Sequence, residues 1–236
     1  MKLATFLIAI AAAATLNPAL IAQTNDPTHA YRDEVSKFII RYPADMDVAL
    51  QPFFPIKPGK DPNKKSYNSC ISTPFTATRQ VGERLDILIE NRIDDVCIDN
   101  MDVTPRVLAI FTQTLFTQGI STLGQNPVVS PDLVSGFVEG HDAISLSGHV
   151  SFSNKPGMTL YLSQTCIRVQ KDMVSLQFIS STEDGLKMLQ QSSIQFEGGS
   201  PLPVFPLASS KIVELTDKGE LRENNSPSSK PSAPPQ

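Results

Sequence analysis

The chain has 236 residues, with 20 Lys and Arg against 24 Asp and Glu, and a formal net charge of -4 at pH 7. A nucleic-acid-binding protein needs a basic face that displaces counterions, so this acidic balance argues against nucleic acid as a partner. The most basic stretch, KPGKDPNKK at 57–65, places its lysines among prolines and an aspartate, which is typical of a solvated loop.

Residues 1–22 have the pattern of a secretory signal peptide. Lys2 precedes an apolar run from Leu3 to Ala14, and small residues surround a cleavage point after Ala22. The run is about a dozen residues long, short of the roughly 20 that cross a bilayer, so a retained membrane anchor is the less favoured alternative. We therefore expect a periplasmic or secreted protein without a transmembrane segment after cleavage, beginning with a linker at 23–30.

Residues 31–198 are predicted to form a single domain in which most segments have a period of two. In VSKFIIRYP, Phe38, Ile40 and Tyr42 alternate with polar neighbours, which indicates a half-buried strand. Pro43 lacks a backbone donor and is expected to end the pairing of this strand.

The next two strands are predicted to form a hairpin. CISTPFTATR at 70–79 and RLDILIENRI at 84–93 are separated by Gly82 and Glu83, which suit a turn. The second strand is expected to have an apolar and a polar face, because Leu85, Ile87 and Ile89 alternate with Asp86 and Glu90.

The three cysteines of the chain lie in the exported part, where oxidation is possible. Cys70 and Cys97 are symmetric about the turn at Gly82, so we predict a disulfide between them that stabilises the fold by roughly 3 kcal/mol. Their side-chain parity differs, which calls for a bulge in one strand. Cys166 is predicted to be a buried small side chain; a thiol enzyme that uses Cys97 or Cys166 is the less favoured alternative.

An acidic segment, ENRIDDVCIDNMD at 90–102, does not fit a calcium loop. Such a loop needs oxygen ligands at alternate positions and a glycine at its sharp turn, whereas apolar residues interrupt this segment and it contains no glycine. We expect a solvated connection whose acids suit the N-terminus of the helix that follows.

That helix is predicted over TPRVLAIFTQTLFTQG at 104–119. Thr104 can cap its N-terminus, Pro105 suits the first helical position, and Gly119 can provide a left-handed stop. An apolar stripe of helical spacing is formed by Val107, Leu108, Ile110, Phe111 and Leu115.

Two of the three histidines lie in EGHDAISLSGHV at 139–150. The alternation predicts a strand over 142–152 with Ile144 and Val150 on one face and His149 on the other, polar face. His141 and His149 are eight residues apart, roughly 26 Å along a strand, too far to share a metal or a proton relay. We expect surface imidazoles without a catalytic role.

The remaining folded segments are a hairpin, a short helix and a final strand. MTLYLSQTCIRV and MVSLQFISS flank the polar QKD at 170–172, which predicts a second hairpin. A helix over 181–191 is expected to have Ser181 as its cap, with Leu186 and Leu189 facing inward, before the strand SIQF.

Residues 199–236 are predicted to be a disordered tail rich in proline and serine. Their composition has no sustained period and little apolar surface to bury. KIVEL at 211–215 could still dock as a strand.

Strands in hairpins with singly inserted helices favour an α+β fold, an antiparallel sheet with helices packed on its faces.

The serines in LSGHV and VSGFV lack the second glycine of a G-x-S-x-G nucleophile motif, and no spacing pairs the aspartates for catalysis. We predict no catalytic, metal or cofactor site. The favoured function is a non-enzymatic binding or assembly module of the cell envelope, whose partner is another envelope or secreted protein; the alternative is a secreted hydrolase with catalytic residues dispersed in sequence.

The order of several segments resembles the PsbP-like α/β/α sandwich domains of exported bacterial proteins. These segments are YRDEVSKFIIRYPADMDV, the capped helix, GHDAISLSGHV, the hairpin LYLSQTCIRVQKDMVSLQFIS and SSIQF. The resemblance implies an antiparallel sheet with helices on both faces and a binding or assembly role without a shared catalytic site. Met46 stands where the family pattern YPxxW has tryptophan, and the hairpin with two cysteines lies outside that pattern, so the resemblance leaves the partner open.

Overall fold

The computed structural model describes residues 28–50, 71–93, 102–123, 125–130, 132–152, 157–170 and 172–223. The predicted signal peptide, both cysteines of the predicted disulfide, most of the acidic connection and the end of the chain lie outside these residues. No helix within the described ranges is long and apolar enough to span a membrane.

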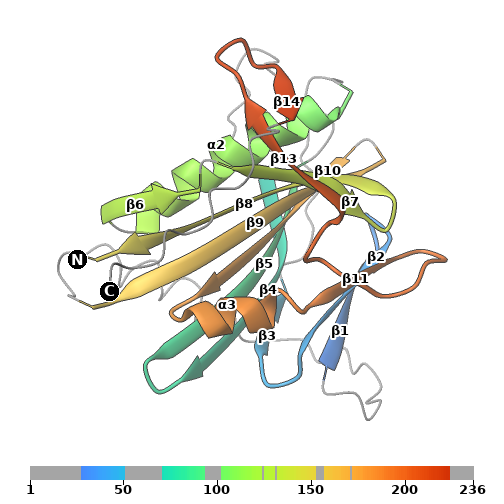
Figure 1. Cartoon of the computed structure of the whole chain (residues 1–236). Coiled ribbons are helices and arrows are strands. Elements are labelled where there is room, and N and C mark those ends of the chain that lie inside the picture. The colour runs from blue at the N-terminus through green and yellow to red at the C-terminus, as the bar shows by residue number, and fades with distance from the viewer. Residues whose placement is uncertain are drawn as a thin grey trace, which may run out of the picture.

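The strands form two antiparallel sheets (Figure 1). The smaller has the order β1-β2-β11-β12, and the larger has the order β14-β13-β7-β8-β9-β10-β5-β4-β3, with β6 also pairing with β8. The small sheet contains β1 (Thr28–Asp33), β2 (Phe38–Pro43), β11 (Ser193–Phe196) and β12 (Leu202–Pro203). The large sheet contains β3 (Asp47–Leu50), β4 (Ile71–Val81), β5 (Arg84–Ile93), β6 (Gln125–Val129), β7 (Leu133–Val138), β8 (His141–Ser151), β9 (Thr159–Val169), β10 (Asp172–Ser180), β13 (Ala208–Leu215) and β14 (Leu221–Glu223).

One face of the large sheet is covered by α2 (Pro105–Leu123), which crosses β8 and β9 in Figure 1. Leu108, Phe116 and Ile120 of the helix pack there against apolar side chains of the sheet. The face predicted for the histidine-containing strand is confirmed, because Ile144, Leu146, Val150 and Phe152 all belong to this cluster.

The opposite face of the large sheet is covered by the small sheet together with α3 (Glu183–Leu189). Phe38, Ile40 and Tyr42 of β2 point into this second core, as their alternation predicted. Met46, 5% exposed, belongs to the same core. The predicted α+β class with an antiparallel sheet is confirmed. The expectation of helices on both faces of the sheet is not confirmed, because the four-stranded sheet forms much of the layer on the second face.

The start of α2 agrees with the prediction and its end does not. The Thr104 hydroxyl accepts from the Val107 N–H at 3.4 Å, but the helix continues through Gly119 to Leu123. Ile120 is 1% exposed and extends the buried stripe beyond the glycine. Burial of such a side chain stabilises by roughly 2 kcal/mol, more than the roughly 1 kcal/mol that glycine costs in a helix.

The polar face expected for β5 is present, but it is covered by the second layer of the fold. Both hairpins form with the predicted turns, but Asp86 and Glu90 are fully buried beneath the second layer.

The cap of α3 differs from the prediction by one residue, since the Thr182 hydroxyl, and not that of Ser181, accepts from the Gly185 N–H at 3.0 Å.

Residues beyond 198 differ most from expectation. KIVEL is part of β13, which pairs with β7, and β14 pairs with β13 in turn. Leu207 and Val213 are each 4% exposed and contribute to the two cores. The expected tail therefore supplies strands as far as residue 223, because an existing sheet edge provides backbone partners that the segment lacks alone.

Candidate functional site

The structure does not bring the two histidines of β8 together. His141 Nδ1 lies 3.1 Å from the Arg168 carbonyl oxygen, and its ring packs on Phe196 with centroids 3.9 Å apart. His149, near the other end of the strand, lies beside Tyr161 at 6.1 Å between ring centroids. These contacts involve the backbone and aromatic rings, and no carboxylate of the described residues pairs with either histidine for acid–base chemistry.

Cys166 lies under α2 and is completely buried. The Gln164 side-chain amide donates to its Sγ at 3.5 Å. Burial raises the pKa of the Cys166 thiol, which keeps it protonated and unreactive. This agrees with the predicted buried small side chain.

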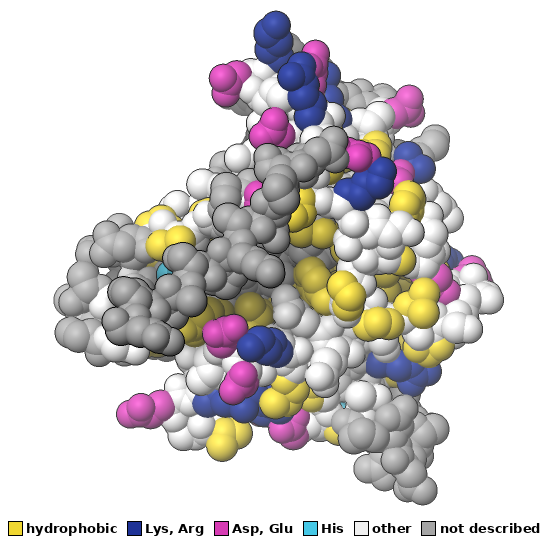
Figure 2. All heavy atoms as spheres, viewed as in Figure 1, with side chains coloured by type: hydrophobic (Ala, Val, Ile, Leu, Met, Phe, Trp, Pro, Cys, Tyr) yellow, Lys and Arg dark blue, Asp and Glu magenta, His cyan; other side chains and the backbone are white. Residues whose placement is uncertain are grey.

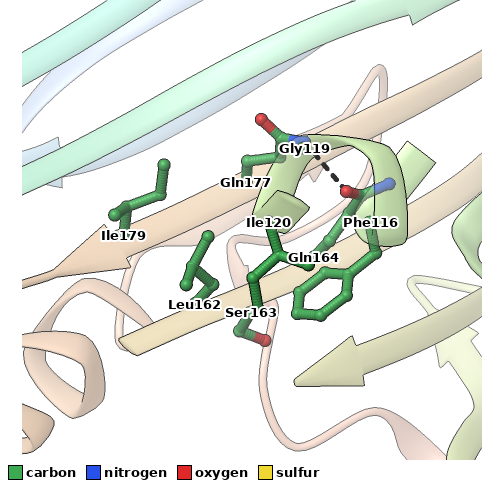
Figure 3. A pocket seen from close by; sticks show the side chains of 8 residues that line it. All are labelled: Phe116, Gly119, Ile120, Leu162, Ser163, Gln164, Gln177 and Ile179. Carbon is green, nitrogen blue, oxygen red and sulfur yellow. Dashed lines mark hydrogen bonds between the residues drawn. The ribbon is translucent and has the colours of Figure 1, made fainter. Parts of the chain in front are cut away.

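A small cavity lies close by, between α2 and the sheet (Figure 3). Gln177 donates to Gln164 at 2.8 Å across its wall, while Phe116, Gly119 and Ile120 of the helix face the strands. Its volume is about 30 Å³. That is room for about one water molecule and too little for an organic ligand. The described ranges also contain no group of three side chains that could hold a metal ion.

The opposite face of the large sheet contains a row of ionisable side chains on β5, of which all but Arg84 are buried. Arg84, Asp86, Glu90 and Arg92 share one face because they alternate along the strand, with Leu88 between the acids. Leu88 packs in the second core and divides the row into two clusters.

The first cluster surrounds the Asp86 carboxylate. Asp86 Oδ2 accepts from Arg79 Nη2 at 2.6 Å and Nε at 3.0 Å, and from Arg84 Nε at 2.9 Å. Oδ1 accepts from the Ser180 hydroxyl at 2.6 Å. Arg79 Nη1 donates to both carboxylate oxygens of Asp45, at 2.8 and 2.7 Å, so the pair joins the turn after β2 to the large sheet. Charged side chains of both signs are visible around α3 in Figure 2.

Gly185 allows α3 to lie directly on this cluster. A Cβ atom at this position would collide with the Ser180 hydroxyl and would lie 2.5 Å from Asp86 Oδ1 and 2.9 Å from Thr182 Oγ1. The helix therefore approaches the carboxylate only because residue 185 has no side chain.

We expect Gly185→Ala to lower the free energy of unfolding by about 1–3 kcal/mol, although alanine is the better helix former, because the methyl group overpacks the cluster. The matched control is Gly119→Ala in α2, where the nearest atom to an added Cβ is Gln177 Nε2 at 3.9 Å. That variant should be more stable than the wild type by about 0.5–1 kcal/mol. Urea denaturation of both variants measures the difference, and two stabilising alanines would contradict this packing.

The second cluster contains two acids and an arginine between the sheets. Glu90 is fully buried, and Arg92 Nη1 lies 3.6 Å from Asp33 Oδ1. Burial, reinforced by the Asp33 carboxylate, raises the pKa of Glu90 to about 9, so Glu90 is protonated at neutral pH. Burial likewise raises the pKa of Tyr31. Asp33, Glu90 and Arg92 are buried and Tyr31 is half-buried against the same core, which suits a structural role.

A hollow of about 580 Å³ opens beside the first cluster. Its wall includes the ends of β1 and β2, the turn after β2 and the residues that follow α3. Three buried polar atoms of its lining have no hydrogen-bond partner within the described part of the chain: Thr28 Oγ1, Arg41 Nε and Ser192 Oγ. Most buried polar groups are paired, and the second cluster, where such atoms also gather, is buried between the sheets and does not line this hollow.

A larger hollow of about 760 Å³ lies at the tips of the β4–β5 and β8–β9 hairpins. Its lining includes Arg84, Met158 and Thr182, and no buried unpartnered polar atom of the described residues belongs to it. The hollow at Arg41 and Ser192 is therefore the better candidate for a ligand site.

Sequence reasoning found none of the residues of this candidate site. Arg41 was predicted only to be a polar residue of its strand. Arg79, Asp45 and Ser192 belong to no sequence motif that indicates a binding site. The only available signal was the charge alternation on β5, which has the same pattern for a solvated and a covered sheet face.

No family model and no curated protein matches the chain. Similar solved structures include the PsbP protein CyanoP of Synechocystis sp. PCC 6803, with 12% identity, a TM-score of 0.44, and coverage of 78% of this chain and 98% of that chain. LpqN of Mycobacterium tuberculosis, described as involved in cell envelope biogenesis, has 16% identity, a TM-score of 0.37, and coverage of 71% and 90%. Protein PA94 of Pseudomonas aeruginosa, of unknown function, has 13% identity, a TM-score of 0.33, and coverage of 69% and 88%. The predicted PsbP-like resemblance is confirmed as a likeness to a solved structure, and at these TM-scores it carries no conclusion about function.

Proposed function

We propose that the protein is an exported, non-enzymatic binding or assembly module of the cell envelope. The observation that carries this proposal is the hollow beside Arg79, where donors without partners gather at an opening of ligand size. The side chains that commonly supply a nucleophile or a base, Cys166 and the two histidines of β8, are instead buried or packed on aromatic rings.

The proposed partner is another envelope or secreted protein. The net charge of -4 disfavours nucleic acid, and the signal-peptide pattern of residues 1–22 supports a destination in the periplasm or the medium. Native mass spectrometry of the protein purified from its host envelope tests both the bound partner and the export of the chain. We expect a chain cleaved after Ala22 that retains a bound protein or ligand.

The His141→Ala, His149→Ala double variant is the control for this experiment, since neither residue lines the hollow. It should retain the same bound mass as the wild type. A bare, uncleaved monomer in both preparations would contradict the proposal, and loss of the bound mass in the double variant alone would move the binding site to β8.

We also propose the Cys70–Cys97 disulfide, which would close the β4–β5 hairpin at its open end. Ile71 and Ile93 are opposite one another at the open end of that hairpin; Cys70 directly precedes Ile71, and Cys97 follows Ile93 by four residues. Without reductant, the unfolded protein should have one alkylatable thiol, Cys166, and reduction should lower the free energy of unfolding by about 3 kcal/mol. Three alkylatable thiols before reduction would contradict the bridge.

A further inference from the structure

Thr28, Arg41 and Ser192 line the hollow beside Arg79, and each has a buried side-chain atom that can donate a hydrogen bond and has no partner among the described residues. Arg41 Nε is a cationic donor, and the hydroxyls of Thr28 and Ser192 can each donate one hydrogen bond. Ser192 is 5% exposed, so its hydroxyl loses water without gaining a protein partner. An unpaired buried hydroxyl costs about 1–3 kcal/mol, a cost that a bound acceptor would remove.

The charge of the lining also favours an anion. Arg41 and Arg79 are cationic, whereas Asp45 is the one acidic residue in this lining. No described carboxylate lies within 4.0 Å of the Arg41 guanidinium, although its Nε is buried. A partly desolvated guanidinium without a counterion is suited to recognising an oxyanion.

Asp45 shows which oxyanion fits. Its carboxylate accepts from Arg79 Nη1 with both oxygens, yet its side chain is 61% exposed at the tip of a turn in which the Met46 N–H donates to the Pro43 carbonyl at 3.2 Å. Arg79 Nε and Nη2 donate to Asp86, which is fully buried, and Nη2 also donates to Met188 Sδ at 3.2 Å. Asp45 is therefore the partner of Arg79 that can most readily be replaced by a carboxylate from outside.

We propose that this hollow binds a carboxylate group, with Arg41, Ser192 and Thr28 as its donors and Asp45 as the internal carboxylate that competes for Arg79. This inference rests on the proposed binding function and specifies its ligand. The carboxylate belongs either to a free small acid or to an acidic side chain of a protein partner. Tyr42 and Met188 in the lining provide apolar contact for the carbon atoms beside the carboxylate.

Isothermal titration calorimetry of the mature chain tests the proposal at constant ionic strength. The probes are succinate, the peptide acetyl-Gly-Asp-Gly-amide and inorganic phosphate, each against sodium chloride. We expect saturable binding of succinate or the peptide, and the tighter of the two identifies the source of the carboxylate. Tighter binding of phosphate, or no saturable binding of any probe, would overturn the proposal.

Matched variants connect that binding to the hollow. Arg41→Met should weaken it tenfold or more, while Arg32→Met, on the neighbouring strand and paired with exposed Glu34, should not change it. Asp45→Asn should tighten it several-fold, in contrast to Asp47→Asn at an exposed position of β3. Equal effects of each variant and its control would overturn the assignment.

Ser192→Ala separates a binding role from a structural role. The variant should bind the probe several-fold more weakly and unfold at the same or a higher urea concentration, because it removes an unpaired buried hydroxyl. Lower stability with unchanged binding would overturn the role of Ser192. If the probes fail but the host-purified protein retains its partner, this inference fails and the proposed function stands; a bare host-purified chain contradicts the proposed function itself.

Discussion

Replacing Glu90 by glutamine should raise the free energy of unfolding at neutral and alkaline pH, by an amount that grows with pH. Glu90 is fully buried on β5, and its pKa is raised to about 9 by burial and by the nearby Asp33 carboxylate. Glutamine has nearly the shape of the protonated acid and never ionises. The folded states of the two proteins should therefore be similar below that pH, whereas their unfolded states should not.

The direction follows from proton binding in the two states. An unfolded chain releases the Glu90 proton near the ordinary pKa of 4.5, but the folded protein keeps it up to about pH 9. Stability is fully retained below the unfolded pKa and is lost as pH rises toward the folded pKa, at about 1.4 kcal/mol per pH unit. Between pH 5 and 9 the wild type should lose several kcal/mol through this residue.

Urea denaturation of the wild type and Glu90→Gln at intervals between pH 4 and 9 measures this difference. The two should be nearly equal at pH 4 and should diverge steadily above pH 5. Glu197→Gln, at an exposed position after β11, should follow the wild type throughout. A difference between Glu90→Gln and the wild type that does not change with pH would show that Glu90 is ionised in the folded protein.

Glu90 also shows where sequence reasoning succeeded and where it could not. Alternation correctly placed Asp86 and Glu90 on one face of β5, because side chains of a strand point to opposite faces in turn. It could not show that a second sheet covers this face. That information comes from the small sheet, in which Arg41 of β2 pairs with Ser193 of β11, 152 residues later in the chain.

The candidate site depends even more on distant segments. Arg79 meets Asp45 across 34 positions, and Ser180 meets Asp86 across 94. The spacing of apolar residues, the helix caps and the turn residues predict single elements, such as the start of α2 and both hairpins. They carry no information about contacts between residues far apart in the chain. Beyond residue 198 only the possible docking of KIVEL as a strand was foreseen, for the same reason, since β13 depends on the edge of β7 for its hydrogen bonds.

The second large effect is expected for Asp86→Ala, which should lower the free energy of unfolding by about 3–5 kcal/mol. Asp86 is fully buried and accepts hydrogen bonds from Arg79, Arg84 and Ser180. Removing it leaves the guanidinium of Arg79, itself 8% exposed, with Asp45 alone as its carboxylate partner within the described residues. The cost is mainly that of a buried guanidinium that has lost its buried carboxylate partner and keeps only the exposed one.

A double-mutant cycle with Arg79→Met separates the pair from its surroundings. Each single variant should be strongly destabilised. The double variant should lose clearly less free energy of unfolding than the two single variants together, because neither charge of the pair is left without the other. The control is the pair Glu183–Lys187 on α3, whose nitrogen and oxygen are 3.1 Å apart but whose side chains are 64% and 63% exposed. Its cycle should give only a few tenths of a kcal/mol.

Hydrogen exchange of α3 completes this test. The helix lies on Asp86 through Ser180 and Gly185, so in Asp86→Ala its amides should exchange faster relative to those of α2, which packs on the other face of the sheet. Equal acceleration in both helices would mean that Asp86 stabilises the whole fold evenly. A loss confined to α3 would show that the buried cluster holds this helix, and with it Met188 and Ser192 of the hollow, in place.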